Sequence, residues 1–200
     1  AVRMIRFHAE ELHSRADQIA ICGFSAGGHL CASLCVHGKD VTDPDENYQS
    51  VSNRPDAVIL AYPVISSGKY GHRDSFVALL GKNPTEQELD YMALENHVTG
   101  DTPPCWQTAT DEVVPVQNSY LFAQACAKAG VPFAHHVFSE GVHGLSVATE
   151  EWFLQKTGQT ARKTDTLEQV KLLAEAIKDG RTPFPKEKGE EILVAFGIGR

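Results

Sequence analysis

Residues 18–30 of the chain read QIAICGFSAGGHL, and this stretch decides the fold. The apolar run at residues 18–23 predicts a buried strand. Residues 26–37, small and apolar without proline, predict a helix that ends at Gly38. Between them stands Gly23-Phe24-Ser25-Ala26-Gly27, a match to G-x-S-x-G. A strand, a sharp turn and a helix around that motif expose a serine as a candidate nucleophile at the carboxyl end of a sheet.

The motif predicts a particular backbone geometry at Ser25. On a strained elbow we expect Ser25 to have a positive φ, with Gly23 and Gly27 leaving room for the backbone and Gly28 extending that clearance. The backbone N–H of Ala26 is then the candidate oxyanion donor. The alternative is a glycine-rich turn that cradles a phosphate, but the G-K-[ST] and G-x-G-x-x-G patterns are missing from this stretch.

Apolar runs of strand length recur further along the chain. Residues 57–61, 106–110 and 134–138 predict three more strands, and residues 116–129, stopped by Gly130, predict an amphipathic helix. Runs without polar alternation are typical of parallel strands that are covered on both faces. Strands that alternate with helices predict an α/β protein with a parallel sheet and right-handed crossovers.

The remaining segments are less regular. Residues 66–104 form a long, lid-like insertion punctuated by Gly and Pro, and a segment of this kind between two strands usually carries function. We expect a roughly helical start at 2–15, a polar loop at 40–53, short helices at 74–80 and 85–94, later helices at 146–156 and 166–178, and a strand or docked tail at 192–198.

A serine nucleophile needs a base and an orienting carboxylate, in the chain order Ser, Asp, His. Asp111 follows the strand at 106–110, and His143 follows the strand at 134–138 between two glycines. Because the carboxyl ends of parallel strands meet at one edge of a sheet, both side chains are predicted to reach Ser25. A helix N-cap for Asp111 and a solvent-facing loop position for His143 stay open as alternatives.

The other histidines fit the role of base less well. His29 lies one turn into the helix after Ser25, so we expect it to be buried or to support the site indirectly. Surface positions are predicted for His8, His13 and His37. The candidate substrate contacts are Tyr62, His72 and Val114.

The composition excludes several classes of protein. A formal net charge of −8 is unsuited to nucleic acid or to an anionic membrane surface. With 42% hydrophobic and 22% charged residues, the chain is neither collagen-like nor mostly disordered.

The five cysteines lie in apolar segments and predict buried free thiols. We expect neither a metal nor an organic cofactor. Free thiols favour a cytoplasmic location, although a secreted chain that has lost its signal would look the same.

Six segments are recognisable together: residues 21–30, 61–65, 75–81, 102–104, 111–116 and 137–145. They resemble the α/β-hydrolase carbohydrate acetyl esterases, including the bifunctional acetylxylan and feruloyl esterases, over about residues 6–148. The resemblance implies that acetyl or other short acyl groups are removed from small or oligosaccharide, xylan-type esters through an acyl-enzyme. The family's triad carries over to Ser25, Asp111 and His143.

The chain also departs from that family. It has no H-G-G motif, whose backbone N–H groups supply half of the family's oxyanion hole, and the family's earlier strands have no counterpart. The resemblance therefore implies an amino-terminally incomplete copy: the carboxyl-terminal half of the parallel sheet with its flanking helices. We expect a catalytic core at residues 1–157 and a carboxyl-terminal helix and tail at residues 158–200.

The residues leave other functions open. A Ser-His-Asp set fixes acyl transfer and not the leaving group, so a serine peptidase or a dienelactone-type hydrolase is one alternative. A non-catalytic, hydrolase-like fragment is another, because the H-G-G motif is missing. The resemblance also implies that the strand at residues 19–23, central in the family's fold, is paired here on one side only, by residues 57–61. An unpaired apolar edge predicts marginal stability and self-association through that edge, unless the tail at 192–198 folds back onto it.

Overall fold

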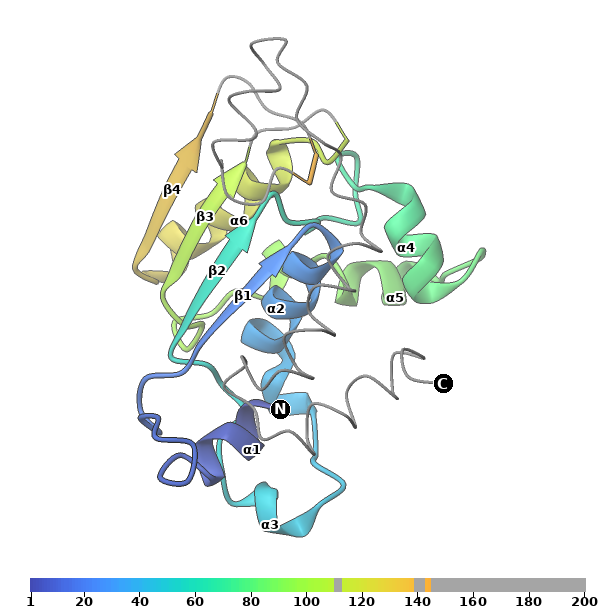
Figure 1. Ribbon diagram of the computed structural model, residues 1–200. Helices are drawn as coiled ribbons and strands as arrows, with labels where there is room; N and C mark the ends of the chain where they lie inside the picture. The colour runs from blue at the N-terminus through green and yellow to red at the C-terminus, as the bar shows by residue number, and fades with distance from the viewer. Residues whose placement is uncertain (110–112, 139–142, 145–200) are drawn as a thin grey trace, which may run out of the picture. The chain divides into compact units, whose positions relative to one another are not determined.

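The computed structural model describes residues 1–109, 113–138 and 143–144. Within them, parallel strands form one sheet in chain order (Figure 1): β1 (Ala20–Phe24), β2 (Ala57–Ala61), β3 (Cys105–Ala109) and β4 (Phe133–Val137). Parallel neighbours need a crossover between them, and helical segments supply it. The predicted parallel α/β architecture is confirmed, with strand bounds that match or differ by one or two residues.

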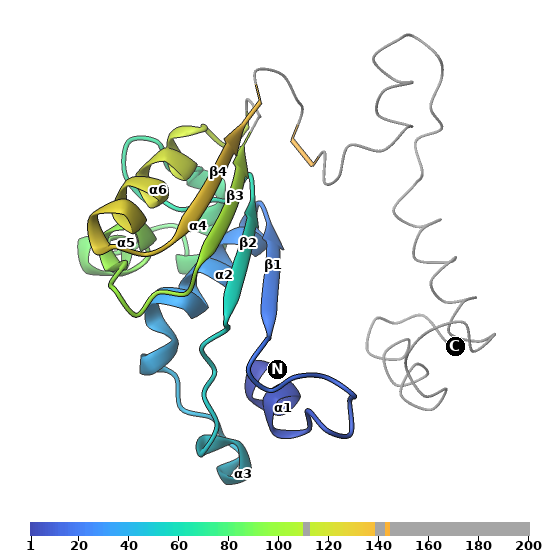
Figure 2. The ribbon, with the colours of Figure 1, turned by 90° about the vertical axis from the view of Figure 1, so that its left-hand side faces the viewer.

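The helices of the described core lie on one side of this sheet (Figure 2). These are α2 (Ala26–His37), α4 (Arg73–Leu80), α5 (Glu86–Tyr91) and α6 (Gln117–Ala129). Helices α2 and α6 pack directly on the strands. The core between them contains fully buried side chains such as Ala32, Leu60, Phe122 and Cys126. None of the helices in the described ranges is long and apolar enough to cross a bilayer.

The opposite face of the sheet is open within the described residues. Because side chains alternate along a strand, Cys22 and its register partner Ile59 both point to this face. Cys22 is exposed there and Cys31 is only partly buried, so the prediction of buried thiols is confirmed for Cys35, Cys105 and Cys126 and is wrong at Cys22. Among the described strands β1 pairs with β2 alone. Self-association through the β1 edge stays a prediction.

Several predicted elements differ in detail. The helical start is shorter than expected: α1 spans Val2–Phe7. The predicted loop at 40–53 contains α3 (Glu46–Gln49), which begins where the Asp45 carboxylate accepts a hydrogen bond from Asn47 N–H. Helix α2 has the predicted bounds, but Gly38 has φ −55°, and the chain continues into a 3₁₀ turn, η1 (Gly38–Asp40), instead of a left-handed stop. The elements predicted at 146–156, 166–178 and 192–198 lie outside the described residues.

The insertion at 66–104 is attached to α2 through the carboxyl end of α5. Thr85 and Glu88 form a capping box that starts α5, which ends earlier than the predicted 85–94. A 3₁₀ helix, η2 (Leu94–His97), follows. Three histidines donate from Nε2 to three consecutive carbonyls at the end of α5: His97 to Asp90, His37 to Tyr91 and His29 to Met92. Helix ends leave carbonyl groups without intrahelical partners. These hydrogen bonds give the last carbonyls of α5 further partners, and those from His29 and His37 hold α5 against α2.

His37 is buried, which corrects its predicted surface position. Its ring stacks on Tyr91 with centroids 3.9 Å apart, and its Nε2 lies 2.7 Å from the Tyr91 carbonyl oxygen. The sequence around His37 gives no sign of this partner, because Tyr91 is 54 residues away.

One buried amide joins the segment after β2 to the start of α6. Asn118 is fully buried; its Oδ1 accepts hydrogen bonds from the backbone N–H groups of Ile65 and Ser66, each at 2.9 Å. Its Nδ2 donates to the carbonyls of Tyr70 and Pro115, also at 2.9 Å. All four hydrogen-bonding positions of the side chain are thus used, which makes burial of the amide favourable. Asn118 fixes two chain segments at the carboxyl edge of the sheet.

Candidate active site

Ser25 occupies the sharp turn between β1 and α2. It has φ 54° and ψ −121°, so the predicted positive φ is confirmed. Two backbone hydrogen bonds hold this conformation: Ser25 N–H donates to the Ala61 carbonyl at 3.0 Å, and Val64 N–H donates to the Ser25 carbonyl at 3.1 Å. A non-glycine residue in a sparsely populated conformation costs on the order of 1–3 kcal/mol, and such strain clusters at functional sites.

The glycines of the motif have different roles. A Cβ on Gly23 would lie 2.2 Å from the Gly27 carbonyl oxygen, and one on Gly28 would lie 2.6 Å from Cβ of Pro63. Both positions therefore exclude any larger residue. A Cβ on Gly27 would meet nothing within 4 Å. The expectation that Gly27 must be a glycine to leave room for the backbone is wrong. The close approach at this turn is between the Gly23 position and the Gly27 backbone, so only Gly23 must lack a side chain.

Ser25 and His143 meet above the carboxyl edge of the sheet. Ser25 Oγ lies 2.8 Å from His143 Nε2, although the two residues are 118 positions apart in the chain. With the ring proton on Nδ1, the serine hydroxyl donates to Nε2, which is the arrangement in which an imidazole takes a proton from a hydroxyl. Asp111, the predicted orienting carboxylate, lies outside the described residues.

The structure describes the surroundings of the three predicted substrate contacts, which stay predictions. Tyr62 is only 6% exposed, and its ring lies edge-on to His143 with centroids 5.2 Å apart. Val114 is buried in a small cluster with Val64 and Phe76. His72 Nδ1 lies 2.9 Å from Ser75 Oγ, at the start of α4.

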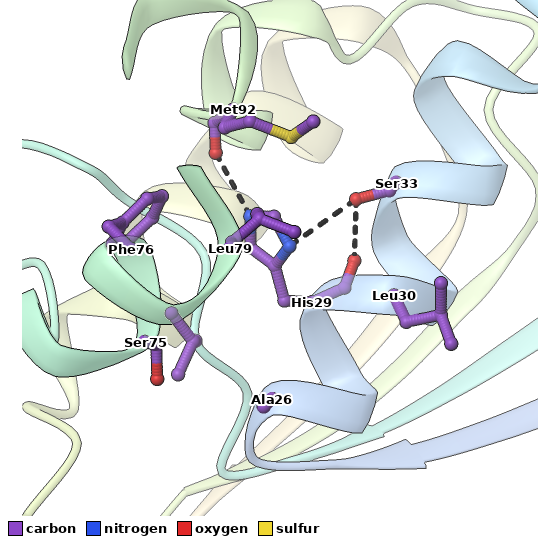
Figure 3. Close-up of a pocket in the computed structure, with 9 residues that line it drawn as sticks. Ala26, His29, Leu30, Ser33, Ser75, Phe76, Leu79 and Met92 are labelled. Carbon is purple, nitrogen blue, oxygen red and sulfur yellow. Dashed lines mark hydrogen bonds between the residues drawn. The ribbon is translucent and has the colours of Figure 1, made fainter. Parts of the chain in front are cut away.

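An apolar pocket of about 240 Å³ opens beside Ala26, between α2 and α4 (Figure 3). Its apolar lining includes Leu30, Val64, Phe76, Leu79 and Met92. Helix α2 contributes Ala26, His29, Leu30 and Ser33, at positions i, i+3, i+4 and i+7 of one helical face. From that spacing, the face of α2 that lines the pocket could have been predicted from the sequence. The residues of α4 that line the opposite side of the pocket have no comparable motif.

His29 supports this pocket and does not compete with His143 as a base. As predicted, it is buried, and its Nε2–H donates to the Met92 carbonyl at 3.0 Å. Burial keeps the pKa of His29 below its usual value, outweighing the opposite effect of that hydrogen bond. The neutral ring packs edge-on against Phe76, with centroids 5.5 Å apart.

The buried thiols are unsuited to nucleophilic chemistry. Burial raises the pKa of Cys35 to about 12 and that of Cys126 to about 11. A thiol must lose its proton to attack, and these two stay protonated at neutral pH. Burial also raises the pKa of Cys22 and Cys31, whereas Ser25 Oγ contacts an imidazole and is the better candidate nucleophile.

Comparison with known proteins finds relatives that match most of this chain. The model of the family described as BD-FAE matches residues 1–126. The chain is 54% identical over 155 residues to endo-1,4-beta-xylanase B of Butyrivibrio fibrisolvens, covering 76% of this chain and 24% of that protein. It is 30% identical over 198 residues to an acetylxylan esterase of Xylanibacter ruminicola, covering 89% of this chain and 38% of that protein.

Solved structures include similar chains. An acetyl ester-xyloside bifunctional hydrolase from Caldicellulosiruptor lactoaceticus superposes with a TM-score of 0.70 at 38% identity, covering 80% of this chain and 64% of that one. The esterase Est2 from Thermogutta terrifontis superposes with a TM-score of 0.60 at 28% identity, covering 82% and 64%. The present chain thus spans less than two thirds of the length of each of these four relatives.

The strain at Ser25 predicts an unusual order of stability between two variants that both remove the hydroxyl. Glycine adopts a positive φ without steric cost and alanine does not. We therefore expect Ser25→Gly to be more stable than Ser25→Ala by about 1 kcal/mol. Urea unfolding of the purified protein measures the difference. Ser50, with φ −71°, is the matched control, and there the alanine variant should be the more stable. The same order at both positions would contradict the strain.

Proposed function

The chain belongs to the BD-FAE family, with an α/β-hydrolase fold, and on that premise we propose that it hydrolyses acyl esters of carbohydrates with Ser25 as the nucleophile. The observation that carries this proposal is the 2.8 Å contact between Ser25 Oγ and His143 Nε2, made by a serine held at φ 54°. A serine and a histidine that merely share a surface need no such strain to meet.

The proposed reaction is an acyl transfer in two halves. Ser25 Oγ attacks the ester carbonyl carbon while His143 Nε2 takes the hydroxyl proton, and the Ala26 N–H donates to the oxyanion that forms. The tetrahedral intermediate expels the sugar hydroxyl, which receives the proton from His143. Water then attacks the acyl-enzyme by the same route and releases the carboxylic acid. We assign to Asp111 the role of orienting the His143 ring and stabilising the imidazolium.

The pocket beside Ala26 is the proposed site for the acyl group. It adjoins the residue that follows the nucleophile, and its apolar lining suits a hydrocarbon chain better than a sugar. Its volume of about 240 Å³ exceeds what an acetyl group needs, so we propose acetyl and other short acyl groups as substrates. Two similar proteins are named an acetylxylan esterase and an acetyl ester-xyloside bifunctional hydrolase, which supports a carbohydrate ester over a peptide.

Removing either partner of the Ser25–His143 contact should abolish esterase activity. We expect Ser25→Ala and His143→Ala each to lower kcat/KM for p-nitrophenyl acetate and for acetylated xylo-oligosaccharides by about 10⁴-fold or more. Ser50→Ala is the control and should retain the wild-type rate. Cleavage of peptide anilides in preference to these esters would favour a peptidase. The proposal would be refuted if Ser25→Ala still hydrolysed these esters, or if the wild-type protein hydrolysed none of them.

Filling the pocket should change the preferred acyl length. We expect Leu79→Trp to lower the ratio of butyrate to acetate ester turnover at least tenfold, because the longer chain loses its space, while acetate turnover changes little. Leu12→Trp is the matched control: both leucines are 52% exposed, and Leu12 does not line the pocket. Initial rates on p-nitrophenyl esters measure the ratio. An unchanged ratio in Leu79→Trp would place the acyl group elsewhere.

A further inference from the structure

A second strained residue stands directly beside Ser25. Tyr62 follows β2 as Ser25 follows β1, and it too has a positive φ, of 38°. A positive φ is uncommon for a bulky aromatic residue. Pro63 comes next, and a proline disfavours helical conformations of the residue before it, pushing that residue to extended values that Tyr62 does not adopt. Such a conformation persists only where its surroundings enforce it.

The backbones of the two strained residues are coupled. The residue before Tyr62 supplies the carbonyl that accepts the Ser25 N–H, and Val64, two residues after Tyr62, donates to the Ser25 carbonyl. Pro63 packs so closely on α2 that a Cβ on Gly28 would lie 2.6 Å from its Cβ. The turn at Tyr62 therefore cannot relax without disturbing the turn that presents Ser25.

The conformation at Tyr62 places its ring against the candidate base. The ring lies 5.2 Å from the His143 ring, at an interplanar angle of 65°, and 5.9 Å from the Phe24 ring. Aromatic rings in edge-to-face contact at this distance favour a fixed mutual orientation. With only 6% of its surface exposed, Tyr62 has little area left to offer a substrate.

We infer that Tyr62 is a positioning residue: its ring, held by the strained turn, keeps the His143 imidazole within hydrogen-bonding distance of Ser25 Oγ. This inference rests on the proposed function. It assigns to Tyr62 a role in kcat, through His143, in place of the substrate contact predicted from the sequence.

Two substitutions separate the contribution of the Tyr62 ring from that of its hydroxyl group. Tyr62→Gly removes the ring and suits a positive φ, so it should fold. We expect it to lower kcat for p-nitrophenyl acetate by about 30- to 100-fold with KM within threefold of wild type, since a small misplacement of a catalytic group can cost about 10²-fold. Tyr62→Phe keeps the ring and should retain kcat within threefold. Tyr120→Leu is the control, because Tyr120 makes the same kind of contact with His135, at 5.5 Å, away from Ser25.

A double-mutant cycle tests whether Tyr62 acts through His143. In a His143→Ala background the further loss from Tyr62→Gly should fall below threefold, because the group it positions is gone. A raised KM with unchanged kcat, an equal loss in Tyr62→Phe, or the same fold-loss in the His143→Ala background would each overturn the inference while leaving the proposed function intact. Loss of the proposed function would show instead as activity that survives Ser25→Ala.

Discussion

The strained backbone of Ser25 is the constraint on which the rest of the site depends. At φ 54° the residue leaves the strand and enters the helix in one step, which turns its Oγ away from the sheet. Parallel pairing of β1 with β2 places the Ala61 carbonyl where it accepts the Ser25 N–H. Burial of the core between α2, α6 and the strands offsets the cost of the strain, which is on the order of 1–3 kcal/mol.

The insertion at 66–104 depends on the same helix. Histidine Nε2–H groups from α2 and η2 donate hydrogen bonds to the carbonyls at the end of α5. Met92, whose carbonyl accepts from His29, also lines the pocket beside Ala26. Asn118 anchors the start of the insertion to α6 through Ile65 and Ser66. Buried polar groups, rather than additional apolar contacts alone, therefore set where the pocket wall stands relative to Ser25. Such networks specify one arrangement because each group would be costly to leave unpaired.

The sequence predicts the local features of this site and the contact between Ser25 and His143, 118 positions apart, but it predicts the surroundings of other side chains poorly. Bounds of α2 and β2, the positive φ of Ser25 and the burial of His29 follow from motif and periodicity, which act over a few residues. The burial of His37, the exposure of Cys22 and the space at Gly27 depend on which helix or sheet face lies opposite. Tyr62 was recognisable as a residue near the site, but its contact with His143 requires knowing how two strand ends meet. Asp111 lies outside the described residues, and its role stays a prediction.

Labelling with a serine-directed fluorophosphonate tests the central claim most directly, because the probe reacts only with a hydroxyl whose proton a nearby base removes. The account predicts one covalent adduct per chain, located on Ser25 by peptide mass spectrometry. Labelling should be at least about 100-fold slower in His143→Ala, since the imidazole takes the proton as Oγ attacks phosphorus. An adduct on another serine, or labelling of Ser25 at an unchanged rate without His143, would contradict it.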